Sequence, residues 1–487
     1  MKKIIFIALL LPFLMVVSCK KDLTSMNVDP KSPTIALASS LFTTAQHSLV
    51  NVLANQNVNI GINGLIVQYW TETTYTGESN YDLTSRTIPQ NVWDGLYRDA
   101  LKNFQEAKKL VPITVVDPVV QQNDIAVADI MQVFTYYYLV TTFGNIPYSE
   151  ALDVEKSTAP KFDDQKTLYY DLLTRLDADI TALTTTSTSF GKADVVFNGS
   201  VTKWKKFANS LKLRMGITIA DFDDAKAKAT IESAVAGGVF TSNNDNAVFA
   251  YLTAPPNTSP YWTDQILGGR YDFVVTKTIV DLLNANNDPR LPYYFTFNGA
   301  GNGYTGGTPG ASNNFSTFSK PSGPLLVAGS IGKISNPDFP YTLIGYDEVE
   351  FILAEAAERG YNVGGTAAAH YNNAITASIV YWGGTNAQAA TYLLQPSVAY
   401  LTAAGNYKQK IGIQKYMALY MRNYDAYVEV RRLKYPALVA PATARSVFPL
   451  RYTYPTNEQS LNGANYTAAA AAIGGDNVGT KLFWEVN

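Results

Sequence analysis

The stretch YDEVEFILAEAAERGYNVGGTAAAHYNNAITASIVYWG, residues 346–383, decides the fold class. Its helical periodicity predicts two amphipathic helices, over 346–360 and 367–382, separated by a short Gly-containing break. Neither helix can bury its apolar face alone. Two such helices side by side therefore predict packing of the tetratricopeptide type, in which helical pairs stack on one another.

The same periodicity recurs outward from this pair. Trp93, Leu96, Ala100, Phe104 and Leu110, for example, follow the three-and-four spacing of one apolar helix face. Most of the predicted helices fall in neighbouring pairs, although no clean 34-residue period is present. Further helices are predicted over 93–110, about 122–143, 166–184, 201–220, 223–236 and 409–434. The expected fold is all-α: a tetratricopeptide-like scaffold of helical pairs.

A loop-rich, mostly irregular insert is predicted between about 240 and 345, where Pro, Gly, Asn and Ser dominate. Only Val275 to Ala285 has a helical pattern there. A shorter irregular stretch covers 71–90. Long ordered loops in compact proteins often carry functional residues, so we expect a site in these two regions. The alternative is that they only cap the helical core.

The N-terminus has the three parts of an export signal: Lys2 and Lys3, the apolar run Ile4 to Val17, and Ser18 before Cys19. The sequence VVSC at 16–19 is typical of a bacterial lipobox, which would make Cys19 the lipidated first residue of the mature protein. The alternative is an ordinary cleaved signal with an incidental cysteine. We expect a signal peptide over 1–18, a lipidated tether over 19–34 and one helical domain over 35–487, held to the outer membrane by acylated Cys19.

The composition of the 487-residue chain excludes several function classes. Cys19 is the only cysteine and there are two histidines, which excludes intramolecular disulfides, zinc fingers, iron–sulfur clusters and Cys–His hydrolases. A net charge of −2 gives no basis for nucleic-acid binding. GNGYTG at 301–306 has dinucleotide-site spacing, but no helix is predicted after it, so it is read as a loop. We expect no cofactor, no metal site and no catalytic residue.

Aromatic residues in the irregular regions are the candidate ligand contacts. A flat ring can stack on the apolar face of a sugar while neighbouring polar groups bond its hydroxyls. Tyr271 and Asp264 lie among these residues, and the alternative for each aromatic ring is a place in the core. The predicted ligand-binding residues are Trp70, Tyr75, Tyr81, Tyr261, Trp262 and Arg270.

A glycoside hydrolase is the rival from another class. It needs two carboxylates about 5 to 9.5 Å apart. The predicted helix 346–360 carries Glu348 and Glu355 on one face. These acids are more simply explained as carboxylates satisfied by neighbouring helices.

An ordered set of motifs along nearly the whole chain resembles the SusD/RagB family of outer-membrane lipoproteins, in its SusD-like branch. After the lipobox come NVDPKSPT at 27–34, WDGLYRDALKNF at 93–104, TFGNIPYSEAL at 142–152, NDPRL at 287–291, YDEVEFILAEAAERGY at 346–361, HYNNAITASIVYWG at 370–383, IGIQKYMALY at 411–420, YVEVRRLKYPAL at 427–438, FPLRYTYPTNE at 448–458 and GGDNVGTKLFWE at 474–485.

The resemblance implies a non-enzymatic protein facing the cell exterior. Such a protein would capture oligosaccharide and pass it to a SusC-like TonB-dependent transporter, on which it would sit as a lid. A peptide-binding lid of the same architecture stays open as the alternative. The segment 422–436 departs from the family's usual Glu-Ala-Trp and Thr-Gly pattern, which we read as scaffold variation. Of the functional residues, the resemblance carries over only Cys19.

Overall fold

The computed structural model describes residues 36–322 and 332–486. Its backbone divides into two units, Met1–Leu37 and Ala38–Asn487, and the second is described below. The predicted signal peptide, Cys19 and the tether up to residue 34 lie outside the described residues.

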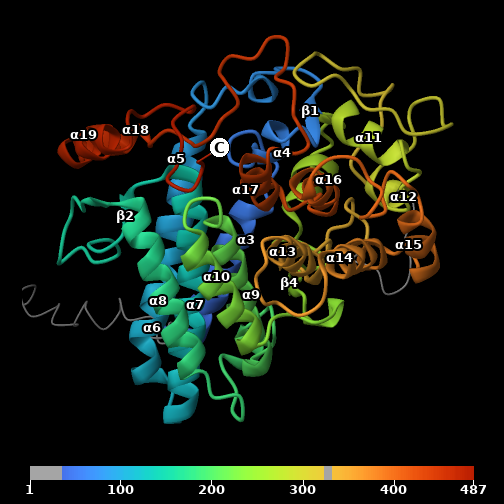
Figure 1. Cartoon of the computed structure of the whole chain (residues 1–487). Helices are drawn as coiled ribbons and strands as arrows, with labels where there is room; N and C mark the ends of the chain where they lie inside the picture. The colour runs from blue at the N-terminus through green and yellow to red at the C-terminus, as the bar shows by residue number, and fades with distance from the viewer. Residues whose placement is uncertain (1–35, 323–331, 487) are drawn as a thin grey trace, which may run out of the picture. The chain divides into compact units, whose positions relative to one another are not determined.

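The second unit is built mainly from helices (Figure 1). The longer α-helices are α3 (Ala38–Leu53), α6 (Lys102–Thr114), α7 (Pro118–Phe143), α8 (Gln165–Ala182), α9 (Val201–Thr218), α10 (Asp224–Gly237), α13 (Tyr346–Glu358), α14 (Ala367–Trp382), α16 (Tyr407–Ala418), α17 (Asn423–Leu433) and α19 (Gly463–Ala472). The short ones are α4 (Asn63–Ile66), α5 (Ile88–Asp94), α11 (Lys277–Asn284), α12 (Leu291–Tyr294), α15 (Asn386–Leu393) and α18 (Thr456–Leu461). Single 3₁₀ turns are η1 (Glu78–Asn80), η3 (Gly191–Ala193) and η4 (Asn243–Asp245), and two π-helical segments are η2 (Gly95–Leu101) and η5 (Trp262–Leu267).

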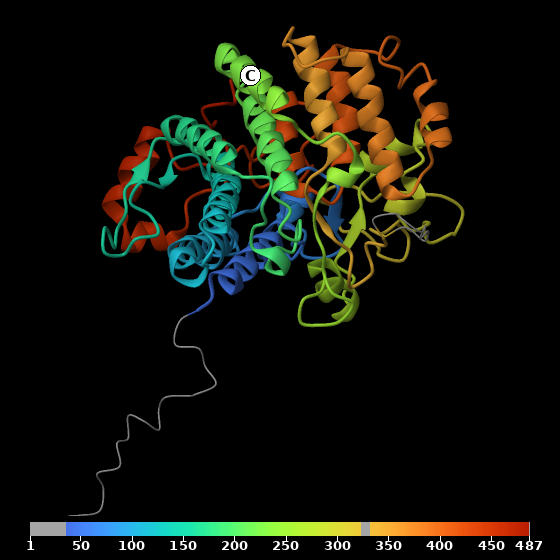
Figure 2. The ribbon, with the colours of Figure 1, turned by 90° about the horizontal axis from the view of Figure 1, so that it is seen from below.

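Neighbouring helices pack as the sequence predicts. Pairs that are consecutive in the chain contact each other along their lengths: α7 with α8, α9 with α10, α13 with α14, and α16 with α17. The pairs also contact one another, since α9 lies against both α8 and α13. Figure 2 shows the green pair α9–α10 beside the orange helices α13 and α14. The predicted all-α, tetratricopeptide-like fold is confirmed.

The structure contains three two-stranded sheets, which were not predicted; one joins the insert to segment 70–72 and another joins the two ends of the insert. The strands are β1 (Trp70–Glu72), β2 (Ile146–Pro147), β3 (Phe162–Asp163), β4 (Ala247–Phe249), β5 (Phe273–Val275) and β6 (Tyr341–Ile344). All three pairs are antiparallel: β1 with β5, β2 with β3, and β4 with β6. Strands of two to four residues leave a weak periodicity, and the partners in β1–β5 and β4–β6 lie far apart in the sequence. The insert over 240–345 thus supplies three strands as well as α11 and α12.

The predicted helix over 409–434 is wrong as a single helix, because the chain breaks between α16 and α17. Met421 takes a left-handed backbone with φ 70°. The next residue, Arg422, donates from Nη2 to Asp347 Oδ2 at 2.5 Å. A buried ion pair with α13 accompanies the break, and periodicity alone does not reveal such a contact. The helix predicted over 93–110 is longer, reaching from Ile88 to Thr114 through the η2 segment.

The acidic side chains of α13 are buried in ion pairs. Arg214 of α9 donates to both carboxylate oxygens of Glu348, at 2.6 and 2.7 Å. Arg432 of α17 does the same to Glu355, at 2.6 Å each. Burial alone would raise the pKa of Glu348, but Arg214 lowers it below its ordinary value. These carboxylates are almost fully buried and join helices together.

Candidate functional site

The two irregular regions predicted to hold a site are brought together by one short sheet. Trp70 of β1 pairs with Val275 of β5, and Glu72 pairs with Phe273. The pairing continues past the strands, because Thr73 N donates to Asp272 O at 2.8 Å and Thr73 Oγ1 donates to Tyr271 O at 2.7 Å. In Figure 1, β1 lies beside the segment that leads into α11. Loop 73–81 and loop 262–272 thus leave the sheet at the same end.

Three of the six predicted contact residues lie in the core beneath these loops. Trp70 is 2% exposed, its Nε1 donates to the Tyr420 hydroxyl at 2.9 Å, and its ring packs 5.9 Å from that of Tyr261. Tyr261 donates to Pro321 O at 3.1 Å. The buried Tyr81 hydroxyl accepts from Gln68 Nε2 at 3.1 Å. These rings have no open face for a ligand, which corrects the prediction for Trp70, Tyr81 and Tyr261: they support the loops from below.

The other three predicted residues reach the surface. Tyr75 is 86% exposed, Trp262 is half-buried and Arg270 is exposed. Neither the Tyr75 ring nor the Trp262 ring packs against another aromatic ring among the described residues. Tyr75 also holds a left-handed backbone with φ 54°, which is uncommon for a bulky residue and often marks a functional position.

Two further aromatic residues extend this surface. Tyr271 is 66% exposed, and the Phe315 ring packs on it at 4.8 Å with the planes 57° apart. Ser312, in the same loop as Phe315, donates from Oγ to Thr73 O at 2.9 Å. Tyr271 stands in the aromatic-rich loop that the sequence singles out, whereas Phe315 carries no sequence signal. We call Tyr75, Trp262, Arg270, Tyr271 and Phe315 the aromatic loop surface.

Polar groups border the rings. Arg270 donates from Nε to Asp272 Oδ2 at 2.5 Å, so this pair adds no net charge. Gln265 Nε2 bonds both Asp264 and Asp272, at 2.8 and 3.2 Å. Asn57 Nδ2 donates to Asp264 at 3.1 Å. Exposed rings with an amide and carboxylate border suit a polar, uncharged ligand that has apolar faces.

Two carboxyl groups lie buried under loop 73–81. Burial, and then a hydrogen bond with Glu78, raises the pKa of Glu72 to about 8. Glu72 Oε2 accepts from Ser79 N at 2.9 Å, and Glu78 Oε1 accepts from Arg86 Nε at 2.5 Å. Glu72 therefore holds its proton at neutral pH, next to the loop that carries Tyr75. Both acids are almost fully buried, so they act on the loop and not on a ligand.

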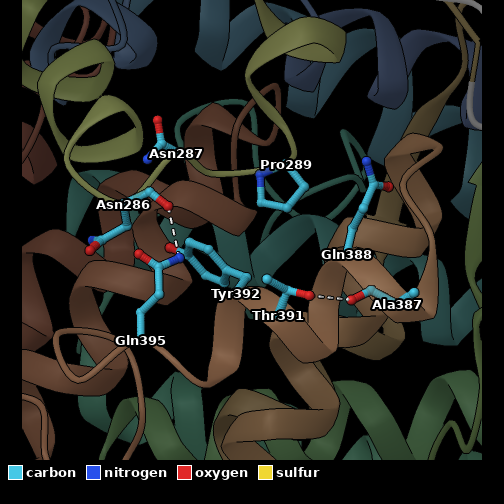
Figure 3. A pocket seen from close by; sticks show the side chains of 8 residues that line it. All are labelled: Asn286, Asn287, Pro289, Ala387, Gln388, Thr391, Tyr392 and Gln395. Carbon is cyan, nitrogen blue, oxygen red and sulfur yellow. Dashed lines mark hydrogen bonds between the residues drawn. The ribbon is translucent and has the colours of Figure 1, made fainter.

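Two cavities are lined by residues outside the aromatic loop surface. One of about 680 Å³ is lined by Gln68, Lys277, Asp281, Pro309, Val439 and neighbouring residues. Another of about 550 Å³ lies between residues 286–289 and α15 (Figure 3). None of the six predicted contact residues lines either cavity. The candidate site is thus a surface of rings and not a deep pocket.

Within residues 36–322 and 332–486, no group of three or more His, Cys, Asp or Glu side chains is arranged to hold a metal ion. Across that same part of the chain, no helix combines the length and apolar character that a membrane span requires.

Comparisons with known proteins agree on one family. Residues 30–455 match the SusD-like model described as starch-binding and associating with the outer membrane. No curated protein sequence matches the chain. A solved chitin-binding protein is 26% identical with a TM-score of 0.78, and the match covers 92% of this chain and 100% of that one. A SusD homologue from Bacteroides uniformis is also 26% identical, with a TM-score of 0.77 and coverage of 92% and 99%. A chitin-binding SusD homologue from Flavobacterium johnsoniae is 23% identical, with a TM-score of 0.76 and coverage of 92% and 98%, and supports the fold alone.

Proposed function

The chain belongs to the SusD-like family of outer-membrane-associated starch-binding proteins, and we propose that it captures a neutral oligosaccharide on the aromatic loop surface and delivers it to a SusC-like TonB-dependent transporter. SusD-like homologues are carbohydrate-binding proteins and not enzymes. The buried ion pairs of Glu348 and Glu355 support the same role here, because a hydrolase needs its acid pair at the ligand.

The observation that carries the proposal is the exposure of Tyr75 and Tyr271 on two loops that the β1–β5 sheet holds together. Each ring offers an apolar face to solvent, and the sheet below fixes its loop. Burying such faces against the C–H face of a sugar removes apolar area from water. Bordering amides and the Arg270–Asp272 pair can bond hydroxyl groups.

We expect the affinity to be weak, between about micromolar and millimolar, which corresponds to roughly −8 to −4 kcal/mol. A ligand passed on to a pore must be released readily, and an open surface buries only one side of it. The near-neutral border favours uncharged sugars over acidic ones.

The proposed location is the outer membrane, with the acylated Cys19 as anchor. The helices described here provide no membrane span. Several acyl chains on one cysteine would hold the protein stably, at about 0.8 kcal/mol per buried methylene. The polar tether up to residue 34 would let the ligand surface reach a partner.

A glycan array tests the ligand class, with pools of peptides as the competing class. The panel includes starch and chitin oligosaccharides, because the family description names starch and a 26% identical relative is chitin-binding. Binding to one or more neutral glycans and to no peptide pool supports the proposal. Binding to peptides alone would replace it with the peptide-binding alternative.

The transporter is tested separately. A tagged chain is solubilised from its own outer membrane in mild detergent and purified. Copurification of a TonB-dependent β-barrel supports the delivery role. If the chain purifies alone, while a known lipoprotein–barrel pair survives the same treatment, the partnership is wrong.

A further inference from the structure

The cavity between residues 286–289 and α15 shares no residue with the aromatic loop surface. It has a volume of about 550 Å³, which is within the range of small-molecule sites. Its lining combines the turn after α11 with one face of α15. Figure 3 shows Asn286, Asn287 and Pro289 across from Ala387, Thr391 and Gln395, with Tyr392 between the two sides.

The two walls are held in place by direct contacts. Gln395 Nε2 donates to Asn286 O at 2.8 Å, and Ser397 Oγ donates to Asn286 Oδ1 at 2.5 Å. Below the turn, Arg290 and Asp288 form a buried ion pair at 2.6 Å. The pocket is therefore preformed, and a ligand need not order it on binding.

The start of α15 is also fixed. Its N-terminus has a capping box, in which Gln388 N donates to Thr385 Oγ1 at 3.2 Å and Thr385 N donates to Gln388 Oε1 at 2.8 Å. The capping box uses Gln388 Oε1 and leaves Nε2 as a donor. The wall that α15 contributes is thus as well defined as the turn opposite.

The lining has the chemistry of a neutral sugar site. It contains Asn, Gln and Thr side chains with Pro289 and Ala387, and no charged residue. The remaining lining residue, Tyr392, is 1% exposed and its hydroxyl bonds Gln414. Among the described residues, the side-chain amide of Asn287 has no hydrogen-bond partner and Gln395 Oε1 accepts no hydrogen bond, so donors and acceptors both remain for hydroxyl groups. The lining offers no cationic side chain to an anionic ligand and no carboxylate to a cationic ligand.

We infer that the pocket between residues 286–289 and α15 is a second binding site for a neutral oligosaccharide. The inference rests on the proposed function for the ligand class and adds a separate point of attachment. Two weak sites on one long glycan raise the effective concentration at each, so capture becomes tighter without slowing release from either one.

Saturation-transfer NMR on the mature protein tests this site, with maltotetraose, chitotetraose, cellotetraose and xylotetraose as probes. The aromatic loop surface is first removed with Tyr75→Ala, Trp262→Ala and Tyr271→Ala together. Thr391→Trp is then added to fill the pocket. The matched control is Ala390→Trp, which places the same ring on the same helix at an exposed position outside the lining. Thermal melts confirm that each variant is folded.

We expect the triple variant to keep a weak signal for at least one probe, at about millimolar affinity. Thr391→Trp should reduce that signal about tenfold or abolish it, and Ala390→Trp should leave it unchanged. If the triple variant loses all binding, the second site is wrong while the proposed function stands. Residual binding that survives Thr391→Trp also overturns the second site. If the wild-type protein binds none of the four probes, the second site is overturned, and the glycan array decides the proposed function separately.

Discussion

Tyr75 is the residue at which conformation and exposure both depart from what stability favours. A bulky side chain in a left-handed backbone costs about 1–3 kcal/mol, and its ring is left in water. The surrounding loop holds it there, since Asn80 Nδ2 donates to Thr76 O at 2.7 Å and Gly77 N donates to Tyr75 O at 2.7 Å. A ligand contact at Tyr75 would explain why the strained backbone and the exposed ring are retained.

Replacing Tyr75 with Ala should weaken oligosaccharide binding about fivefold, which corresponds to about 1 kcal/mol of lost ring contact. Stability should change by less than about 0.5 kcal/mol, because the side chain is 86% exposed. Titration calorimetry and urea unfolding measure the two effects. Tyr75→Phe, which keeps the ring, is the matched variant and should bind nearly as well as wild type.

Trp70 should behave in the opposite way. Trp70→Ala removes a buried ring that supports both loops, and we expect a loss of about 3–5 kcal/mol in the free energy of unfolding. An unchanged urea midpoint in this variant would contradict its place in the core.

The contrast between Tyr75 and Trp70 also marks what could be predicted of the site. The sequence predicts aromatic residues of the two irregular regions as ligand contacts, yet the sequence surroundings of buried and exposed rings look alike. Trp70 is buried because its indole bonds Tyr420, which lies 350 residues away. Phe315 joins the surface only because its loop folds against Tyr271. Contacts at such separations leave no local pattern in the sequence.

The proton that Glu72 retains predicts a pH dependence of stability. The folded protein binds this proton up to about pH 8, whereas an unfolded glutamate releases it near its ordinary pKa of 4.5. Stability should therefore fall as the pH rises between these values, by up to about 1.4 kcal/mol per pH unit for the one group. Glu72→Gln cannot titrate and should flatten this slope.

Urea unfolding measured between pH 5 and 9 gives the comparison. Glu155→Gln, at an exposed position, is the control and should keep the wild-type slope. A Glu72→Gln variant whose slope equals that of wild type would show that the buried proton is absent.

At the scale of elements, buried ion pairs join α13 to its neighbours. Arg432→Met leaves Glu355 and Glu429 without their main partner in the core, and we expect a loss of about 3–5 kcal/mol in the free energy of unfolding. Arg98→Met, which breaks a pair with the exposed Asp99, should cost less than about 1 kcal/mol. Equal losses in the two variants would contradict the structural role of the α13 carboxylates.

The helical pairs were predictable because each carries its own periodicity, as α13 and α14 do. The break between α16 and α17 was not, since it coincides with the pairing of Arg422 with Asp347 of α13. The strands β1 and β5 escaped prediction because three residues are too few to show alternation. The local sequence pattern is enough to predict the helices, whereas the break between α16 and α17 and the β1–β5 pairing depend on long-range contacts.

At the scale of the whole molecule, location depends on the N-terminus. Cys19→Ala should move the protein from the outer-membrane fraction to the soluble fraction, because the acyl chains supply the anchoring free energy. Fractionation followed by immunoblotting measures this. Ser18→Ala, which keeps a small residue before the cysteine, should stay in the membrane. A Cys19→Ala protein that still sediments with the outer membrane would refute the anchor.

The most direct test of the central claim is calorimetric titration of the mature protein with the glycan that the array selects, beside the Tyr75→Ala, Trp262→Ala and Tyr271→Ala triple variant. We predict binding in the micromolar to millimolar range for wild type, a loss of about tenfold or more in the folded variant, and no release of shorter sugars over hours. Unchanged affinity in the folded triple variant, or steady release of shorter sugars by the wild type, would contradict capture on the aromatic loop surface.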